Sequence, residues 1–191
     1  FRLLSASGRG TASDPIILVE EITSLKPAVL AVRPVNNARN ESGQTPSHRI
    51  LMRSVVKLVV NKSAWRWTGF DLELRGESGQ ASRYSDGLSF DQLSAIPTPF
   101  QSDLFASIRA QDEPHDRLRY DQGQVEPQQT VQIAFNLMDL NPRALFFLAQ
   151  EPIVLLTEGP AIPNIARPIY AGFTTRPDPA RHRSASFPIS P

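Results

Sequence analysis

Residues 130–137 read Thr-Val-Gln-Ile-Ala-Phe-Asn-Leu, and apolar and polar side chains alternate along almost the whole stretch. Successive side chains of an extended chain point to opposite faces, so Val131, Ile133, Phe135 and Leu137 share one face. This period of two predicts a half-buried β-strand. A turn signal with glycine and proline precedes it at residues 123–127.

A second stretch of the same kind lies upstream, at residues 61–74. An Asn-Lys-Ser turn leads through two tryptophans into Phe70, Leu72 and Leu74, which alternate with charged residues. Because the longest predicted strand, residues 50–61, comes directly before this turn, the pattern predicts a hairpin. Together with the strand at residues 130–137, it predicts an antiparallel all-β domain.

The strand predicted at residues 50–61 has two unequal faces. One face carries Met52, Val56, Leu58 and Val60. The other mixes valines with Lys57 and Asn61, so we expect it to be the outer and partly wet face of a central strand.

Apolar runs bounded by turn residues predict further strands. They cover residues 16–23, 28–32, 88–91, 118–120, 144–149 and 153–157, the last two separated by Pro152. Residues 1–15 have the composition of a loop, and residues 102–110 have the apolar spacing of a short helix capped by Ser102. We therefore predict an immunoglobulin-like or related antiparallel β-sandwich over residues 12–157, after an N-terminal extension at residues 1–11.

The composition narrows the functional classes. The 191 residues include no cysteine, which excludes disulfides, thiolate metal sites and a cysteine nucleophile. Seventeen prolines leave little room for long helices. No window approaches the ~18 to 20 uninterrupted apolar residues of a transmembrane helix, so we expect a chain that does not span a membrane. The net charge of +1 and the dispersed arginines argue against a nucleic-acid partner.

The character of the chain changes at residues 158–191, where proline and arginine are frequent and apolar residues are isolated. Such a segment cannot form its own core and favours extended conformations, so we predict an extended C-terminal arm. We expect its apolar residues, together with the start of the apolar strand at residues 16–23, to contact protein partners. These candidate partner-binding residues are Ile16, Ile17, Ile169, Tyr170, Phe173 and Phe187.

No catalytic constellation is present in the sequence. His48, His115 and His182 lie in separate predicted loops without a partner at metal-ligand spacing, and no nucleophile elbow or phosphate-binding loop occurs. We therefore expect no enzyme, no cofactor and no metal at these histidines.

Two groups of residues leave a ligand-binding alternative open. Acidic residues in predicted loops could supply oxygen ligands to calcium, although such residues are more often solvated; they are Asp86, Asp91, Asp103, Asp112, Glu113, Asp116 and Asp121. Aromatic residues could stack on sugar rings, although a tryptophan beside a hairpin more often fills the end of a core; they are Trp65, Trp67, Phe70, Tyr84 and Phe90.

The stretch at residues 61–74 resembles the Asn-x-Ser/Thr-x-x-Trp-x-x-Phe-x-x-Glu-Leu pattern of uncharacterised secreted bacterial β-sandwich proteins. Residues 84–90 and 123–135 are similar to later strands of that group and of immunoglobulin-like modules. The likeness covers residues 50–150 and implies the fold of a secreted bacterial β-sandwich without catalytic residues.

These observations favour a non-catalytic structural or interaction subunit of an extracytoplasmic assembly, whether periplasmic, cell-surface or secreted. We expect it to associate with copies of itself or with other proteins through strand edges and the C-terminal arm. The alternative is a carbohydrate- or calcium-binding β-sandwich module.

Overall fold

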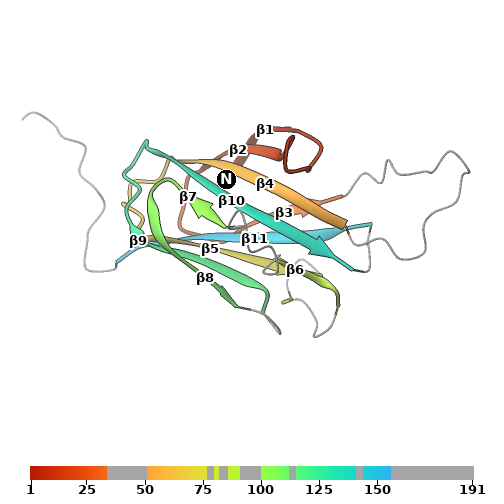
Figure 1. The fold of residues 1–191 in the computed structure, drawn as a ribbon. Coiled ribbons are helices and arrows are strands. Elements are labelled where there is room, and N and C mark those ends of the chain that lie inside the picture. Colours follow the sequence, from red (N-terminus) through yellow and green to blue (C-terminus); the bar gives the residue numbers. More distant parts are fainter. Residues whose placement is uncertain are drawn as a thin grey trace, which may run out of the picture. The chain divides into compact units, whose positions relative to one another are not determined.

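The computed structural model describes residues 1–33, 51–76, 80–81, 86–90, 100–111, 115–140 and 144–155. All regular structure in this part of the chain is β-strand, in two layers (Figure 1). Among the described residues there is no helix of the length and apolar character needed to cross a membrane. The predicted C-terminal arm lies outside the described residues.

The strands form two sheets. The first has the order β1 (Arg2–Ser7), β2 (Ile16–Ile22), β4 (Leu51–Asn61), β10 (Thr130–Asp139) and β6 (Leu88–Phe90), and β7 (Gln101–Ser102) also pairs with β10. The second has the order β3 (Ala28–Val32), β11 (Phe146–Ile153), β5 (Gly69–Arg75), β9 (Arg117–Gly123) and β8 (Phe105–Gln111). Neighbouring strands are antiparallel except β2 and β4, which are parallel.

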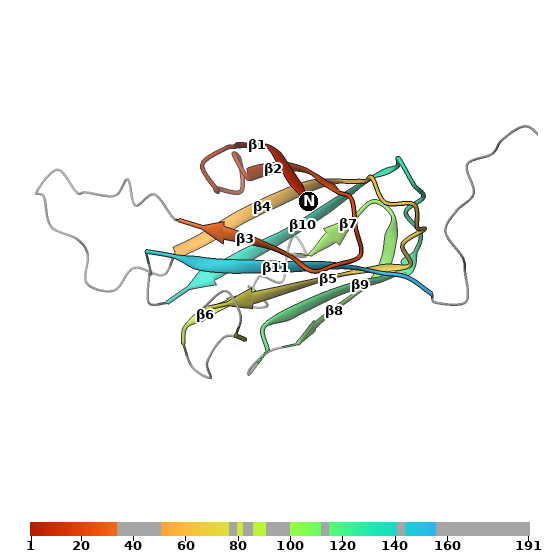
Figure 2. The same cartoon turned by 180° about the vertical axis from the view of Figure 1, so that it is seen from behind.

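The two sheets share one hydrophobic core, so the predicted β-sandwich architecture is confirmed (Figures 1 and 2). The predicted inward faces of β10 and β5 are correct, because their alternate apolar residues are buried in this core. The largest fully buried apolar side chains are Trp67, Tyr120, Phe70, Phe135, Ile22, Leu72, Leu74, Leu88, Leu118, Ile133 and Leu148.

The predicted hairpin between residues 50–61 and 67–75 is wrong. The turn after β4 takes the chain from the first sheet to the second, where β5 pairs with β11 and β9 instead of β4. The partners of β4 are β10 and, in parallel, β2. Both β4 and β5 have a continuous buried face, and placing them in opposite sheets lets these faces pack against each other across the core.

The short helix predicted at residues 102–110 is also wrong, because this stretch forms β8 and pairs with β9. Ser102 does act as a local cap, since its Oγ accepts hydrogen bonds from the backbone nitrogens of Leu104 and Phe105, both at 3.3 Å. The chain then continues as a strand because Phe105 is buried in the core and the β9 backbone offers a full ladder of partners.

The structure also differs from expectation at the two ends of the described chain. Residues predicted as loop form β1, which the following turn folds back onto β2; Gly8 has a φ of +89°, and a Cβ there would lie 1.9 Å from the Pro15 oxygen. At the other end β11 runs unbroken through Pro152. Its pairing with β3 stops at Gln150, so the missing N–H of Pro152 interrupts no ladder on that side.

The orientation of β4 is the reverse of the prediction. Val55, Lys57, Val59 and Asn61 are buried, and the outer face consists of the alternate residues Met52, Ser54, Val56, Leu58 and Val60. Both polar side chains on the buried face have partners: Lys57 contacts Glu20 and Gln150, and the Asn61 amide donates to backbone carbonyls. Satisfied polar groups can be buried, which the alternation of residue types alone does not reveal.

Tyr120 predicts a dependence of stability on alkaline pH. Its hydroxyl donates to the Ala134 carbonyl of the opposite sheet at 3.1 Å, and burial raises the pKa of Tyr120 above its ordinary value. Above about pH 10 the unfolded chain loses this proton while the folded chain keeps it, so the free energy of unfolding should fall by about 1.4 kcal/mol per pH unit. Urea unfolding at a series of alkaline pH values measures this slope. Tyr120→Phe should reduce this slope by about 1.4 kcal/mol per pH unit. An unchanged slope in the variant would refute the assignment of the pH dependence to Tyr120.

Candidate functional site

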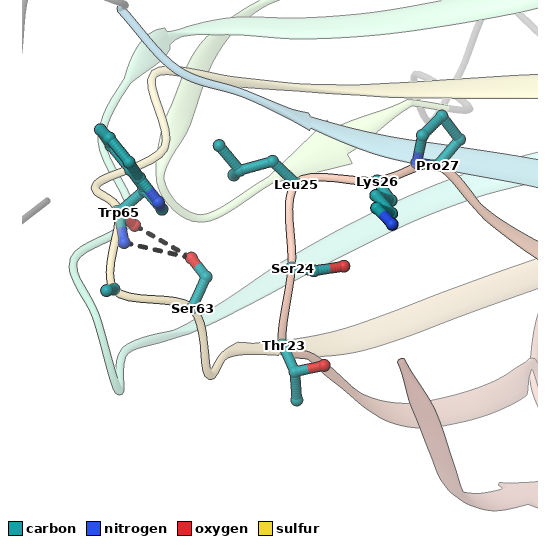
Figure 3. Close-up of a pocket in the computed structure, with 8 residues that line it drawn as sticks. Thr23, Ser24, Leu25, Lys26, Pro27, Ser63 and Trp65 are labelled. Carbon is teal, nitrogen blue, oxygen red and sulfur yellow. Dashed lines mark hydrogen bonds between the residues drawn. The ribbon is translucent and has the colours of Figure 1, made fainter.

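A candidate ligand hollow lies at the end of the sandwich where the β2–β3 and β4–β5 connections meet (Figure 3). It is open to solvent and has a volume of about 630 Å³. Its lining comes from two short segments of the chain: Thr23, Ser24, Leu25, Lys26 and Pro27, and Ser63, Ala64 and Trp65.

The β4–β5 wall of this hollow is held by a buried hydrogen-bond network. The Asn61 amide donates to the carbonyls of Trp65 at 2.8 Å and Val125 at 3.0 Å, and its Oδ1 accepts from the Ser63 hydroxyl at 2.7 Å. The Trp67 indole in turn donates to Ser63 Oγ at 3.1 Å. The Asn, Ser and Trp positions of the motif thus have a structural function, which is to fix a turn between the two sheets.

The structure separates the aromatic residues considered for sugar binding. Trp67, Phe70 and Phe90 are buried in the core, and Tyr84 lies outside the described residues. Trp65 is half-buried and lines the hollow (Figure 3). The carbohydrate alternative therefore depends, within the described chain, on Trp65 and its hydroxyl-bearing neighbours Thr23 and Ser24.

The acidic residues considered for calcium have local partners instead. Asp86 accepts from the Leu88 nitrogen, Asp103 accepts from the Gln132 nitrogen, and Asp121 pairs with Arg109. Asp116 is buried at the start of β9. The other three candidates, Asp91, Asp112 and Glu113, lie outside the described residues.

Where the chain is described, no three His, Asp or Glu residues lie close enough together to hold a metal ion. His115 is exposed, and its Nδ1 lies 3.6 Å from Glu73 Oε1. His48 and His182 fall outside the described residues.

The outer faces of the two sheets differ in chemistry. On the second sheet, cross-strand ion pairs dominate: Arg119 binds Asp71 with two hydrogen bonds, Nε–Oδ1 at 2.8 Å and Nη2–Oδ2 at 2.5 Å. Arg109 on β8 pairs with Asp121 on β9, and within β5 Arg75 Nε lies 2.6 Å from Glu73 Oε2. This is the charged, solvated face expected of an antiparallel sheet.

The outer face of the first sheet is largely apolar. Across β2, β4 and β10 the register aligns Ile17 with Val56 and Val56 with Ala134. Ile17 is 37% exposed, and the others are half-buried. The apolar residues of this face, which we call the apolar outer face, are Ile17, Val19, Met52, Val56, Leu58, Val60, Ala134 and Met138.

Beside the apolar outer face lies the edge strand β1. It pairs with β2 on one side only, and all six of its residues are exposed. Leu3 and Leu4 are 42% and 45% exposed. The apolar run here is too short to indicate a strand, and the small and turn residues that follow it led to the prediction of a loop.

The structure describes two of the predicted partner-binding residues, Ile16 and Ile17, and places them in different surroundings. Ile16 packs against the core, whereas Ile17 lies on the apolar outer face. Of these two, Ile17 is the one that a partner can contact directly. Ile169, Tyr170, Phe173 and Phe187 lie outside the described residues.

Comparison of the chain with protein-family models, with curated proteins and with solved structures finds no match. The resemblance to secreted bacterial β-sandwich proteins therefore stays a prediction.

Proposed function

We propose that this chain is a non-catalytic structural and interaction subunit of an extracytoplasmic assembly. It associates with protein partners, including copies of itself, through the β1 edge, the apolar outer face and the C-terminal arm. The immunoglobulin-like character of the sandwich and the extended arm belong to the same proposal.

The observation that most supports this function is the combination, in the described part of the chain, of an exposed edge strand with an adjoining apolar surface, although the register of β1 against β2 shifts between Leu3 and Ser5. Native proteins usually protect edge strands with lysine, proline or bulges, because free N–H and C=O groups recruit other strands. In β1 the only charged side chain, Arg2, is paired with Glu21 at 2.9 Å. The β1 edge can add a strand from a partner, and the apolar outer face can bury against it.

Lysine at the edge should weaken this association. Leu3→Lys together with Leu4→Lys adds two charges to exposed positions, so the fold should persist while self-association falls at least about tenfold. Light scattering over a concentration series, with circular dichroism as the folding check, measures the effect.

The matched control is Val29→Lys. Val29 is 37% exposed and lies on β3, an edge strand of the second sheet. If association survives the β1 substitutions, or if Val29→Lys weakens it as strongly, then β1 is not the contact.

The hollow beside Trp65 supports a second candidate function, carbohydrate binding. An accessible indole next to hydroxyl groups can stack on a sugar ring and bind its hydroxyls. Titration with soluble glycans, followed by calorimetry and by tryptophan fluorescence, tests it: binding should disappear in Trp65→Ala. A flat response across the glycan panel would remove this candidate.

A further inference from the structure

Three polar side chains meet in the middle of the core. Glu20 on β2, Lys57 on β4 and Gln150 on β11 are each at most 1% exposed. Glu20 Oε1 lies 2.7 Å from Lys57 Nζ, and Gln150 Nε2 donates to Glu20 Oε2 at 3.1 Å. Lys57 Nζ donates to Gln150 Oε1, which closes the triangle.

The surroundings of this triangle are apolar. The residues two positions away on the same strands, and hence on the same inward face, are Leu18, Ile22, Val55, Val59, Leu148 and Pro152. Across the second sheet, Gln150 lies opposite Ala28 and Leu72. An apolar setting disfavours charge, and burial lowers the pKa of Lys57 despite the nearby carboxylate.

The arrangement is that of an amide-exchange reaction. A lysine amine freed of its proton by a desolvated site is a nucleophile, and here it lies against the carbonyl of a primary amide. One carboxyl group contacts both the nitrogen that would attack and the nitrogen that would leave, the position required of a general acid–base. The folded sheets hold all three groups in place, which can raise the effective concentration to the order of 10⁵ M or more.

We propose that Lys57 and Gln150 form an isopeptide bond inside the folded protein, with Glu20 as the acid–base residue. Glu20 Oε1 takes a proton from the Lys57 ammonium, and the neutral Nζ attacks Cδ of Gln150. The carboxyl group then protonates Nε2 while accepting the second proton of Nζ. The Cδ–Nε2 bond breaks, ammonia leaves, and the Nζ–Cδ amide remains beside a protonated Glu20.

The bond would replace a buried ion pair with neutral groups, and it would join the centres of the two sheets. Lys57 lies on β4 of the first sheet and Gln150 on β11 of the second (Figures 1 and 2). The two residues are 93 positions apart, so the link would close most of the described chain into one loop. A chain without cysteine cannot form such a link by a disulfide. This proposal does not depend on the proposed association through β1.

The test is the intact mass of the denatured full chain. We expect a mass lower than the sequence mass by one ammonia molecule, and a tryptic map with a branched peptide that contains both Lys57 and Gln150. The mass deficit should disappear in Lys57→Arg and in Glu20→Gln, and it should change to the loss of one water in Gln150→Glu.

The chain offers a matched control in Lys62, which donates to Gln128 Oε1 at 2.7 Å on the exposed surface. Lys62→Arg should keep the mass deficit. The proposal is overturned if the folded protein without substitutions has the full sequence mass. A mass deficit that maps elsewhere in the chain would also overturn it. Because the peptide map uses the protein without substitutions, its result does not depend on whether any variant folds.

Discussion

Glu20→Leu is expected to lower the free energy of unfolding by about 3–5 kcal/mol, the range found when one member of a buried ion pair is removed. Glu20 and Lys57 are both fully buried, so the variant leaves an ammonium in the core with only the Gln150 amide as partner. Urea unfolding at neutral pH measures the change. The variant also lacks the carboxyl group that we propose as the acid–base residue of the crosslinking reaction. Loss of the ion pair and loss of the crosslink both lower the free energy of unfolding.

The neighbouring residue supplies the control. Glu21 points to the opposite face of the same strand and pairs with the exposed Arg2 at 2.9 Å. Since exposed ion pairs contribute little, Glu21→Leu should change the free energy of unfolding by less than about 1 kcal/mol. Equal effects at the two positions would contradict the buried network.

A second substitution separates the noncovalent contribution from the covalent one. Adding Lys57→Met to Glu20→Leu removes the unpaired charge, and apolar replacement of a buried ion pair is often neutral for stability. If only noncovalent contacts act here, the double variant should recover most of the lost stability. If the double variant folds but stays several kcal/mol less stable than the protein without substitutions, the result would indicate that the protein without substitutions contains the crosslink.

The predictions that succeeded depend on period-two alternation at strands with one apolar and one polar face. In β10 and β5 the alternate apolar residues Val131, Ile133, Phe135, Phe70, Leu72 and Leu74 are buried in the core, as the pattern requires. The β4 prediction failed because both of its faces are largely apolar. Its inward face contains Lys57, whose partner Gln150 lies 93 positions away, and Asn61, one of whose partners is Val125, 64 positions away. A sequence window around β4 contains no information about such partners.

The pairing of strands was harder to predict than the strands themselves. A short connection, such as residues 62–68 between β4 and β5, can join either the strands of a hairpin or two strands in opposite sheets, and the side-chain pattern on both sides is the same. The Asn61 network decides between these here, because its hydrogen bonds to Trp65 and Val125 tie the turn to the connection before β10. The β1 edge was missed for a related reason, since an exposed edge strand has no buried face to produce a period.

Trp67→Ala is expected to lower the free energy of unfolding by about 3–5 kcal/mol, as large-to-small changes at buried aromatic positions do. Trp67 is fully buried, its ring centre lies 5.9 Å from that of Phe70, and its backbone exchanges two hydrogen bonds of 3.0 Å with Val125. The variant leaves a cavity in the core and removes the indole donor to Ser63 Oγ. Trp67→Phe keeps part of the volume, so its effect should be smaller than that of alanine.

Trp65, two positions along the same turn, is the matched control. It is half-buried and lines the open hollow, so Trp65→Ala leaves no closed cavity and should cost less than about 1.5 kcal/mol. The two tryptophans then differ in function as well as in stability: Trp67 secures the turn between the sheets, and only Trp65 can contact a ligand. If Trp65→Ala destabilises the protein as much as Trp67→Ala, both indoles belong to the core and the hollow loses its one exposed aromatic surface. A sugar-binding function would then have no basis in the described part of the chain.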